Sequence, residues 1–226
     1  LPSWLPAILA VLALSYLGRF WRFRLLLHAE GIGRASRQEA WVWLQGFALT
    51  ATPGKMGELA RVQQLHRQLS YPRMPLVHAF LAERLCDVAA VVIWLTLLVP
   101  AQLQQRLGPW NPTSLGIASL FGLVGVALGC WLWSRRGHWR KHLPSGHLAQ
   151  ACLPGSGLSL GIWGLEAMLL WLLVQAMSPA TPISAGQAIS IYLLSGTAGM
   201  ASLLPGGLGV NEATTTVLLH QAGITT

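Results

Sequence analysis

The segment Pro53-Gly54-Lys55-Met56-Gly57-Glu58 divides two unlike stretches of the chain. Before it lies an uncharged run, Ala40–Thr52, whose thirteen residues would form a helix of about 20 Å, short of the about 30 Å hydrocarbon core of a bilayer. Proline and glycine break helices, and a break at membrane depth is tolerated only where it is buried in protein or lines a cavity. We therefore expect residues 40–52 to form a re-entrant half-helix that turns at Pro53.

A second break of the same kind lies near the end of the sequence, at Pro205-Gly206-Gly207-Leu208-Gly209-Val210-Asn211-Glu212. It follows residues 185–204, an uncharged run rich in Gly, Ser and Thr. Asn211 is expected to cap the next helix, with Glu212 as the acid of its first turn. Two breaks in comparable positions of two halves predict an inverted repeat with a transporter-like binding site between them.

The composition indicates a membrane protein. Of the 226 residues, 53% are hydrophobic, only 10% are charged and eleven are tryptophan, whereas soluble domains carry about 25% charged residues. We predict an all-α polytopic membrane protein with one transmembrane domain, residues 1–226, expected to be part of a longer membrane domain. The net charge is +8, and the basic residues lie between the apolar runs. Contacts with anionic lipid headgroups and the orientation of the chain in the membrane explain this charge better than nucleic-acid binding does.

The apolar runs define the expected helices. Spanning helices are predicted at residues 1–17, 76–99, 115–133 and 158–177, an interfacial amphipathic helix at 58–69, and a turn at 71–75. The basic loops 18–39 and 134–157 are expected on the cytoplasmic side, and loop 100–114 on the opposite side. The first break then enters from the inner face and the second from the outer face.

Four Asp, Glu, Lys or Arg residues fall inside the expected spans, namely Glu83, Arg84, Asp87 and Glu166. A charge at the bilayer centre costs about 2.5–3.5 kcal/mol on the translocon scale, so these residues are candidates for function. For the first three, the alternatives are a structural ion pair between helices or a helix that begins only at Val88. Glu166 is either a protonated or hydrogen-bonded structural residue or, as we favour, the partner of a cation on another helix, with Arg61, Arg84 and Lys55 as candidates.

Glu58 and Glu212 each follow a glycine-containing break. They either complement a helix dipole, worth about 0.3–1 kcal/mol, or line one polar cavity together with the breaks. The histidines of residues 138–147 are too loosely spaced for a metal site, and the three cysteines form no CxxC pair. The sequence shows no nucleophile motif, so we expect no metal, no cofactor and no enzymatic activity.

Four motifs in order resemble those of the lysylphosphatidylglycerol synthase transmembrane-region family, the flippase domain of the multiple peptide resistance factor and its standalone relatives. They are Arg19-Phe20-Trp21-Arg22-Phe23-Arg24-Leu25-Leu26-Leu27, Thr52-Pro53-Gly54-Lys55-Met56-Gly57-Glu58-Leu59-Ala60-Arg61, Glu83-Arg84-Leu85-Cys86-Asp87 and Leu204-Pro205-Gly206-Gly207-Leu208-Gly209-Val210-Asn211-Glu212. The chain departs from the full-length factor in having no soluble aminoacyl-transferase domain, so lipid synthesis is not expected of it.

The resemblance implies a multi-pass protein of the bacterial cell membrane that moves aminoacylated phosphatidylglycerol, or a related lipid-linked headgroup, between leaflets. It implies that the breaks frame the lipid site, that Lys55, Arg61 and Arg84 meet the phosphate, and that a cationic headgroup meets the carboxylates of residues 58, 83, 87, 166 and 212. Expected partners are membrane phospholipids, with a homo-oligomer or a separate lipid-modifying enzyme also open. The alternatives are a membrane-embedded transferase for a lipid-linked substrate and a non-transporting accessory protein.

Overall fold

The computed structural model describes residues 3–33, 36–48, 57–98, 145–178, 183–202 and 207–224. Within these ranges every regular element is an α-helix, as the sequence predicts. The helices are α1 (Leu5–Ala29), α2 (Arg37–Ala48), α3 (Gly57–Leu69), α4 (Arg73–Leu98), α7 (Gly146–Met177), α8 (Ala185–Ala201) and α9 (Val210–Gln221).

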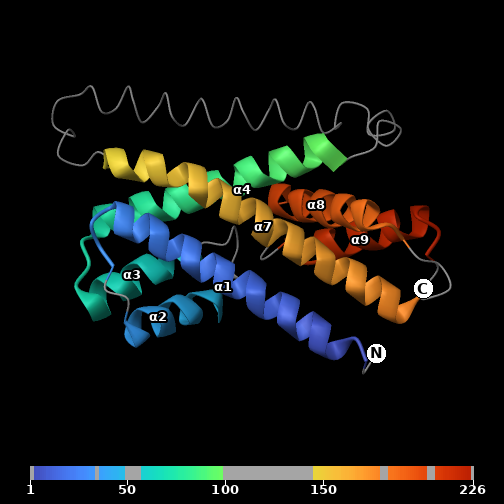
Figure 1. Ribbon diagram of the computed structural model, residues 1–226, viewed down its shortest axis with the longest axis horizontal. Coiled ribbons are helices and arrows are strands. Elements are labelled where there is room, and N and C mark those ends of the chain that lie inside the picture. Colours follow the sequence, from blue (N-terminus) through green and yellow to red (C-terminus); the bar gives the residue numbers. More distant parts are fainter. Residues whose placement is uncertain are drawn as a thin grey trace.

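Helix α7 is the centre of the arrangement. It packs along α1 and also against α4 and α8, while α2 packs on α3 and α8 on α9. In Figure 1, α2 and α3 lie beneath one end of the α1–α7 pair, and α8 and α9 lie toward the other end. Helices α1 and α7 are both long and apolar enough to cross a membrane.

Helix α1 extends beyond its predicted end. The sequence predicted a span over residues 1–17 and a basic loop over residues 18–39, but α1 continues to Ala29 and α2 begins at Arg37. The helix continues because Arg19 and Arg22 find carboxylate partners inside the protein. The loop prediction was therefore wrong for most of this segment.

Helix α7 begins earlier than predicted. Residues 146–157 were expected in a cytoplasmic loop but form its first turns, and the helix passes through Pro154. Ser145 caps the start, since its hydroxyl accepts a hydrogen bond from the N–H of Leu148. The same hydroxyl donates to the carbonyl of Ala29 at 2.7 Å. The start of α7 is thus anchored to the end of α1, a contact that local sequence does not reveal.

Helix α4 begins at Arg73, so part of the expected turn at residues 71–75 is helical. Its continuity to Leu98 excludes a helix that begins only at Val88. Helix α3 confirms the short helix expected at residues 58–69, and α2 confirms a helix in the short apolar run. The predicted span at residues 115–133 lies outside the described residues. The re-entrant course of α2 and the inverted repeat stay predictions.

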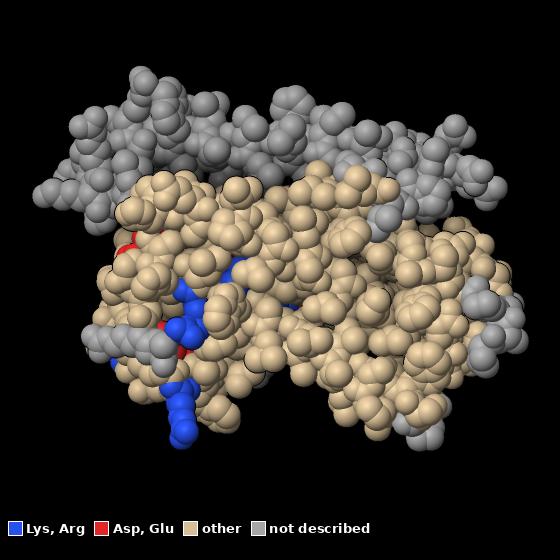
Figure 2. Space-filling model, viewed as in Figure 1, with Lys and Arg blue, Asp and Glu red and all other residues tan. Residues whose placement is uncertain are grey.

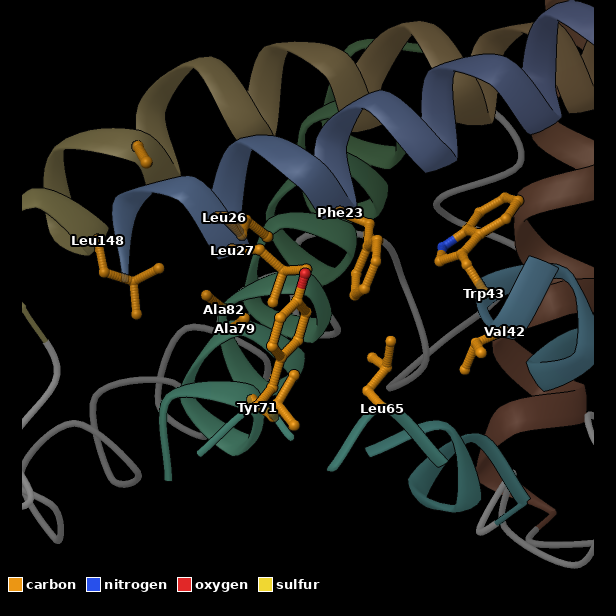
Figure 3. Packing of buried hydrophobic residues seen from close by; sticks show 12 residues of the cluster. Phe23, Leu26, Leu27, Val42, Trp43, Leu65, Tyr71, Ala79, Ala82 and Leu148 are labelled. Carbon is orange, nitrogen blue, oxygen red and sulfur yellow. The ribbon is translucent and has the colours of Figure 1, made fainter. Parts of the chain in front are cut away.

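The buried apolar side chains form separate clusters. The first joins the later part of α1, including Phe23 and Leu26, to α2, α3, the start of α4 and the first turns of α7, and Figure 3 shows these residues converging. The second joins the later part of α4 to Trp163 and α8, and the third joins the end of α7 to α8 and the segment after α9. On α4, the residues between Ala82 of the first cluster and Ala90 of the second include Glu83 and Asp87.

The basic residues are unevenly distributed. No lysine or arginine follows Lys141 in the sequence, which leaves the later part of α7, α8 and α9 without one. On the face shown in Figure 2, the basic side chains accordingly gather over one half of the molecule. The arginines of the described helices therefore all lie on α1, α2, α3 and α4.

Candidate functional site

Arg22 of α1 is the centre of a group of charges between helices. Its side chain is fully buried and binds Asp87 through Nη1. Its Nη2 donates to Glu83 Oε1 at 3.0 Å, and its Nη1 also donates to Ser159 Oγ at 2.5 Å. Glu83 and Asp87 are four residues apart, so both project from one face of α4. A single guanidinium thereby joins α1, α4 and α7.

Two further arginines complete this group. Arg61 of α3 donates to the second oxygen of Glu83 at 2.6 Å, and its guanidinium carbon lies 4.9 Å from the centre of the Phe23 ring. Arg84 lies 3.5 Å from Glu83 and 3.2 Å from Asp87. Its side chain is 32% exposed, against 0% for Arg22 and 5% for Arg61. The structural ion pair left open by the sequence is therefore confirmed, with Arg84 at its accessible edge.

The position of Arg61 differs from the sequence-based expectation. On the amphipathic helix predicted at residues 58–69, a charged side chain is expected on the polar face, yet Arg61 is only 4% exposed. Helix α2 approaches it at Gly46, where a Cβ would come within 3.2 Å of the Arg61 side chain. The aliphatic stem of the arginine packs against α2 and the aromatic ring while its head binds Glu83. An amphipathic pattern cannot distinguish such a buried cation from a solvated one.

A second group of charges surrounds Glu166 of α7. Its Oε1 accepts hydrogen bonds from Arg19 Nη2 at 2.5 Å and from Ser15 Oγ at 2.8 Å, both on α1. Its Oε2 accepts from Tyr192 Oη of α8 at 2.9 Å. The prediction that Glu166 has a cationic partner on another helix is confirmed. The partner is Arg19, so the expectation of Arg61 or Arg84 was wrong.

An aromatic pair connects the two groups. Trp163 of α7 donates from Nε1 to Asp87 Oδ1 at 3.1 Å. Its ring lies 6.0 Å, centre to centre, from the ring of Tyr192, whose hydroxyl binds Glu166. We refer to the combined set as the buried charged network, comprising Arg19, Arg22, Arg61, Glu83, Arg84, Asp87 and Glu166.

The buried ion pairs of the network are expected to add little to the stability of the fold. Desolvating a charge costs several kcal/mol, about as much as a good ion pair returns, and apolar replacements of buried pairs are often neutral or stabilising. Seven charges on four helices are therefore not explained by stability alone. In a membrane protein such charges mark substrate or ion pathways.

The remaining predicted site residues lie apart from the network or outside the described residues. Pro53, Gly54, Lys55 and the Glu58 side chain are outside, and Gly57 is the first residue of α3. That Glu58 and Glu212 line one cavity stays a prediction.

The second break is described from Gly207 onward, so Pro205 and Gly206 are outside. Gly207 has φ +72° and lies so close to Gly199 that a Cβ would come within 2.9 Å of its Cα. Gly209, not Asn211, caps α9 with φ +83°, a conformation that favours glycine. The exposed Glu212 accepts a hydrogen bond from the Gly209 N–H at 2.6 Å, which is the helix-end role. Its role in binding stays a prediction.

Sequence reasoning missed six residues of this site: Ser15, Arg19, Arg22, Ser159, Trp163 and Tyr192. The spacing of Arg19 and Arg22 was a usable signal, since residues three apart lie on one side of a helix, and the apolar run Leu25–Leu27 follows. No comparable signal marked the tryptophan and the tyrosine. The described residues contain no cluster of His, Cys, Asp and Glu able to hold a metal ion.

Comparison with known proteins gives one result. The family model for the lysylphosphatidylglycerol synthase TM region matches residues 2–226. Searches of curated proteins and of solved structures find no match.

Proposed function

The chain belongs to the lysylphosphatidylglycerol synthase TM-region family, and on this premise we propose that it moves a phospholipid headgroup between membrane leaflets. The proposed substrate is aminoacylated phosphatidylglycerol or a related lipid-linked headgroup. The protein makes and breaks no covalent bond in this process. Its task is to offer a polar route through a layer that otherwise excludes charge.

The buried charged network is the observation that carries this proposal. An aminoacylated phosphodiester headgroup combines one anionic phosphate with at least one ammonium group. The network provides both complements side by side, since Arg84 and Asp87 lie 3.2 Å apart on one helix. Arginine binds phosphate oxygens through paired N–H groups, and a carboxylate accepts from ammonium.

Exchange of partners explains how such a route operates. In the described state each carboxylate of the network already has an arginine partner. An entering headgroup replaces one ion pair by two, phosphate with arginine and ammonium with carboxylate, so no charge is left bare during the exchange. Arg84 is proposed to meet the phosphate first because its side chain is the most exposed of the network arginines, 32% against 18% for Arg19.

The test is a leaflet-sidedness assay in liposomes that contain the purified protein and labelled aminoacyl or plain phosphatidylglycerol. The proposal predicts faster exchange of label between leaflets than in protein-free liposomes. It also predicts that Arg84→Met slows exchange, while Arg67→Met, on the exposed face of α3, does not. Equal exchange with and without protein overturns the proposal. Covalently altered lipid would instead support a transferase.

A further inference from the structure

Residues Pro154–Gly157 lie inside α7 at the point where its packing changes. Before them, Leu148 and Ala151 belong to the first hydrophobic cluster. After them, Trp163 belongs to the second cluster and Val174 to the third. The described part of α7 is one helix of 32 residues. Its two arms belong to different hydrophobic clusters, while α1 contacts both arms, at Ser145 and at Glu166.

The sequence of this segment makes the helix locally weak. Pro154 has no N–H to bond the carbonyl of Gln150, and Gly155 and Gly157 follow, so the residue types least favourable in helix interiors are grouped in one turn. The segment Leu153-Pro154-Gly155 also repeats the Leu-Pro-Gly of the break at residues 204–206. Figure 1 shows α7 changing direction along its length.

Serine hydroxyls bond to backbone carbonyls of the preceding turn in this segment. Ser156 donates to the carbonyl of Cys152 at 2.8 Å, and Ser159 donates to the carbonyl of Gly155 at 3.1 Å. Such back-bonding to the preceding turn is associated with bent helices. Ser159 also accepts from the buried Arg22. The weak turn is therefore connected directly to the buried charged network.

The neighbouring helix α4 offers a rigid reference. It contains no glycine, and its only proline, Pro75, lies in its first turn. It carries Glu83 and Asp87, whereas α7 provides the groups that bond the network from the other side, Ser159 and Trp163. A change in the angle of α7 after Pro154 would move those two groups away from Arg22 and Asp87 while Glu83 and Asp87 stay in place on α4. Glu166 of α7 would move with the later arm.

We infer that Pro154–Gly157 is a hinge, and that bending of the later arm of α7 opens and closes access to Arg22 and Asp87. The purpose assigned to the bending rests on the proposed function. The bending itself does not depend on any lipid. The closed state is the one described, in which Arg22 is fully buried. The open state frees one hydrogen-bonding position on each of these residues for a headgroup.

Glycine positions in α7 provide a matched test. A Cβ at Gly157 or at Gly161 would meet no described atom within 4 Å, so either glycine accepts alanine without a clash. Both are exposed, and only Gly157 lies in the hinge. The hinge variant is Pro154→Ala/Gly157→Ala, and Gly161→Ala is the control that stiffens the helix elsewhere.

Bending is measured with nitroxide labels at the exposed positions Ala149 and Leu173, one on each arm, in protein whose three cysteines are replaced by alanine. A straight helix would separate these positions by about 36 Å. The labelled protein without further substitutions is expected to give a broad distribution of distances between the labels. The Gly161→Ala control is expected to give the same broad distribution. The hinge variant is expected to give a narrow one. Equal widths in all three proteins overturn the hinge.

Transport is measured in parallel in liposomes. The hinge variant is expected to exchange lipid about tenfold more slowly, equivalent to about 1.4 kcal/mol, and the control at the wild-type rate. A narrowed distribution without slower transport overturns the role assigned to the bending. If wild-type protein transports no lipid but shows the broad distribution, the proposed function fails while the hinge stands.

Discussion

Arg22 of α1 and Glu83 of α4 form an ion pair of 3.0 Å although their side chains are only 0% and 3% exposed. The pair joins segments 61 residues apart in the chain. Buried charges that lose one partner are strongly destabilising, whereas the complete pair is close to neutral. The network is therefore a sensitive point of the fold as well as the candidate binding site.

Removing the central cation should destabilise the protein. Arg22→Met leaves Glu83 and Asp87 with less positive charge in a buried site, and the free energy of unfolding is expected to fall by about 3–5 kcal/mol. The measurement is the unfolding midpoint of the purified protein in detergent, followed by tryptophan fluorescence. Arg67→Met is the control, because that side chain is exposed. A midpoint unchanged by Arg22→Met would contradict the buried ion pair.

Variants of the Arg19–Glu166 pair allow effects on stability to be distinguished from effects on transport. Arg19→Leu alone leaves Glu166 with hydrogen bonds from Ser15 and Tyr192 but without its cation, so it is expected to be less stable than Arg19→Leu/Glu166→Leu. A double-mutant cycle should give a coupling energy of about 0.5–3 kcal/mol. The double variant should still transport slowly because both charges are gone. Additive effects on the unfolding midpoint would argue against a direct pair.

The crossing of α1 and α7 depends on Gly18. A Cβ at this position would lie 3.0 Å from Ile162 Cγ1, closer than ordinary contact. Gly18→Ala should therefore cost about 1–3 kcal/mol through overpacking, and it should cost less in an Ile162→Ala background, where the Cγ1 atom is absent. Unfolding midpoints of Gly18→Ala in the two backgrounds test this. If Gly18→Ala is as stable as the wild type, the helices are less closely packed than described.

Glu212 allows the helix-end role and the binding role to be separated. Glutamine at this position keeps an acceptor for the Gly209 N–H, so Glu212→Gln should lower stability only by the lost charge–dipole interaction, about 0.3–1 kcal/mol. Glu212→Ala should lower stability by about 1 kcal/mol more, because the hydrogen bond is lost as well. The proposed function adds that Glu212→Gln slows lipid exchange, because the negative charge is lost. If a stable Glu212→Gln protein exchanges lipid at the wild-type rate, Glu212 has only the helix-end role and no role in binding.

The helical class, the short helices before and after Pro53, and the family follow from the sequence by itself. Apolar runs of known length and helix-breaking pairs of residues are local features, so they can be recognised without knowing which distant residues they contact. The charged residues within the expected spans could also be recognised as candidates for function, because a charged side chain inside a bilayer carries a high free-energy cost. Glu83, Arg84 and Asp87 were found in this way.

The tertiary structure decided which charges meet and where helices end. Arg22 looked like part of a basic loop because its partners lie 61 and 65 residues away on α4. Glu166 pairs with Arg19 across 147 residues, and spacing in the sequence cannot choose among several distant cations. Helix α7 starts at Gly146 because Ser145 reaches the end of α1. In each case the deciding interaction joins distant parts of the chain, and its geometry exists only once the helices have packed.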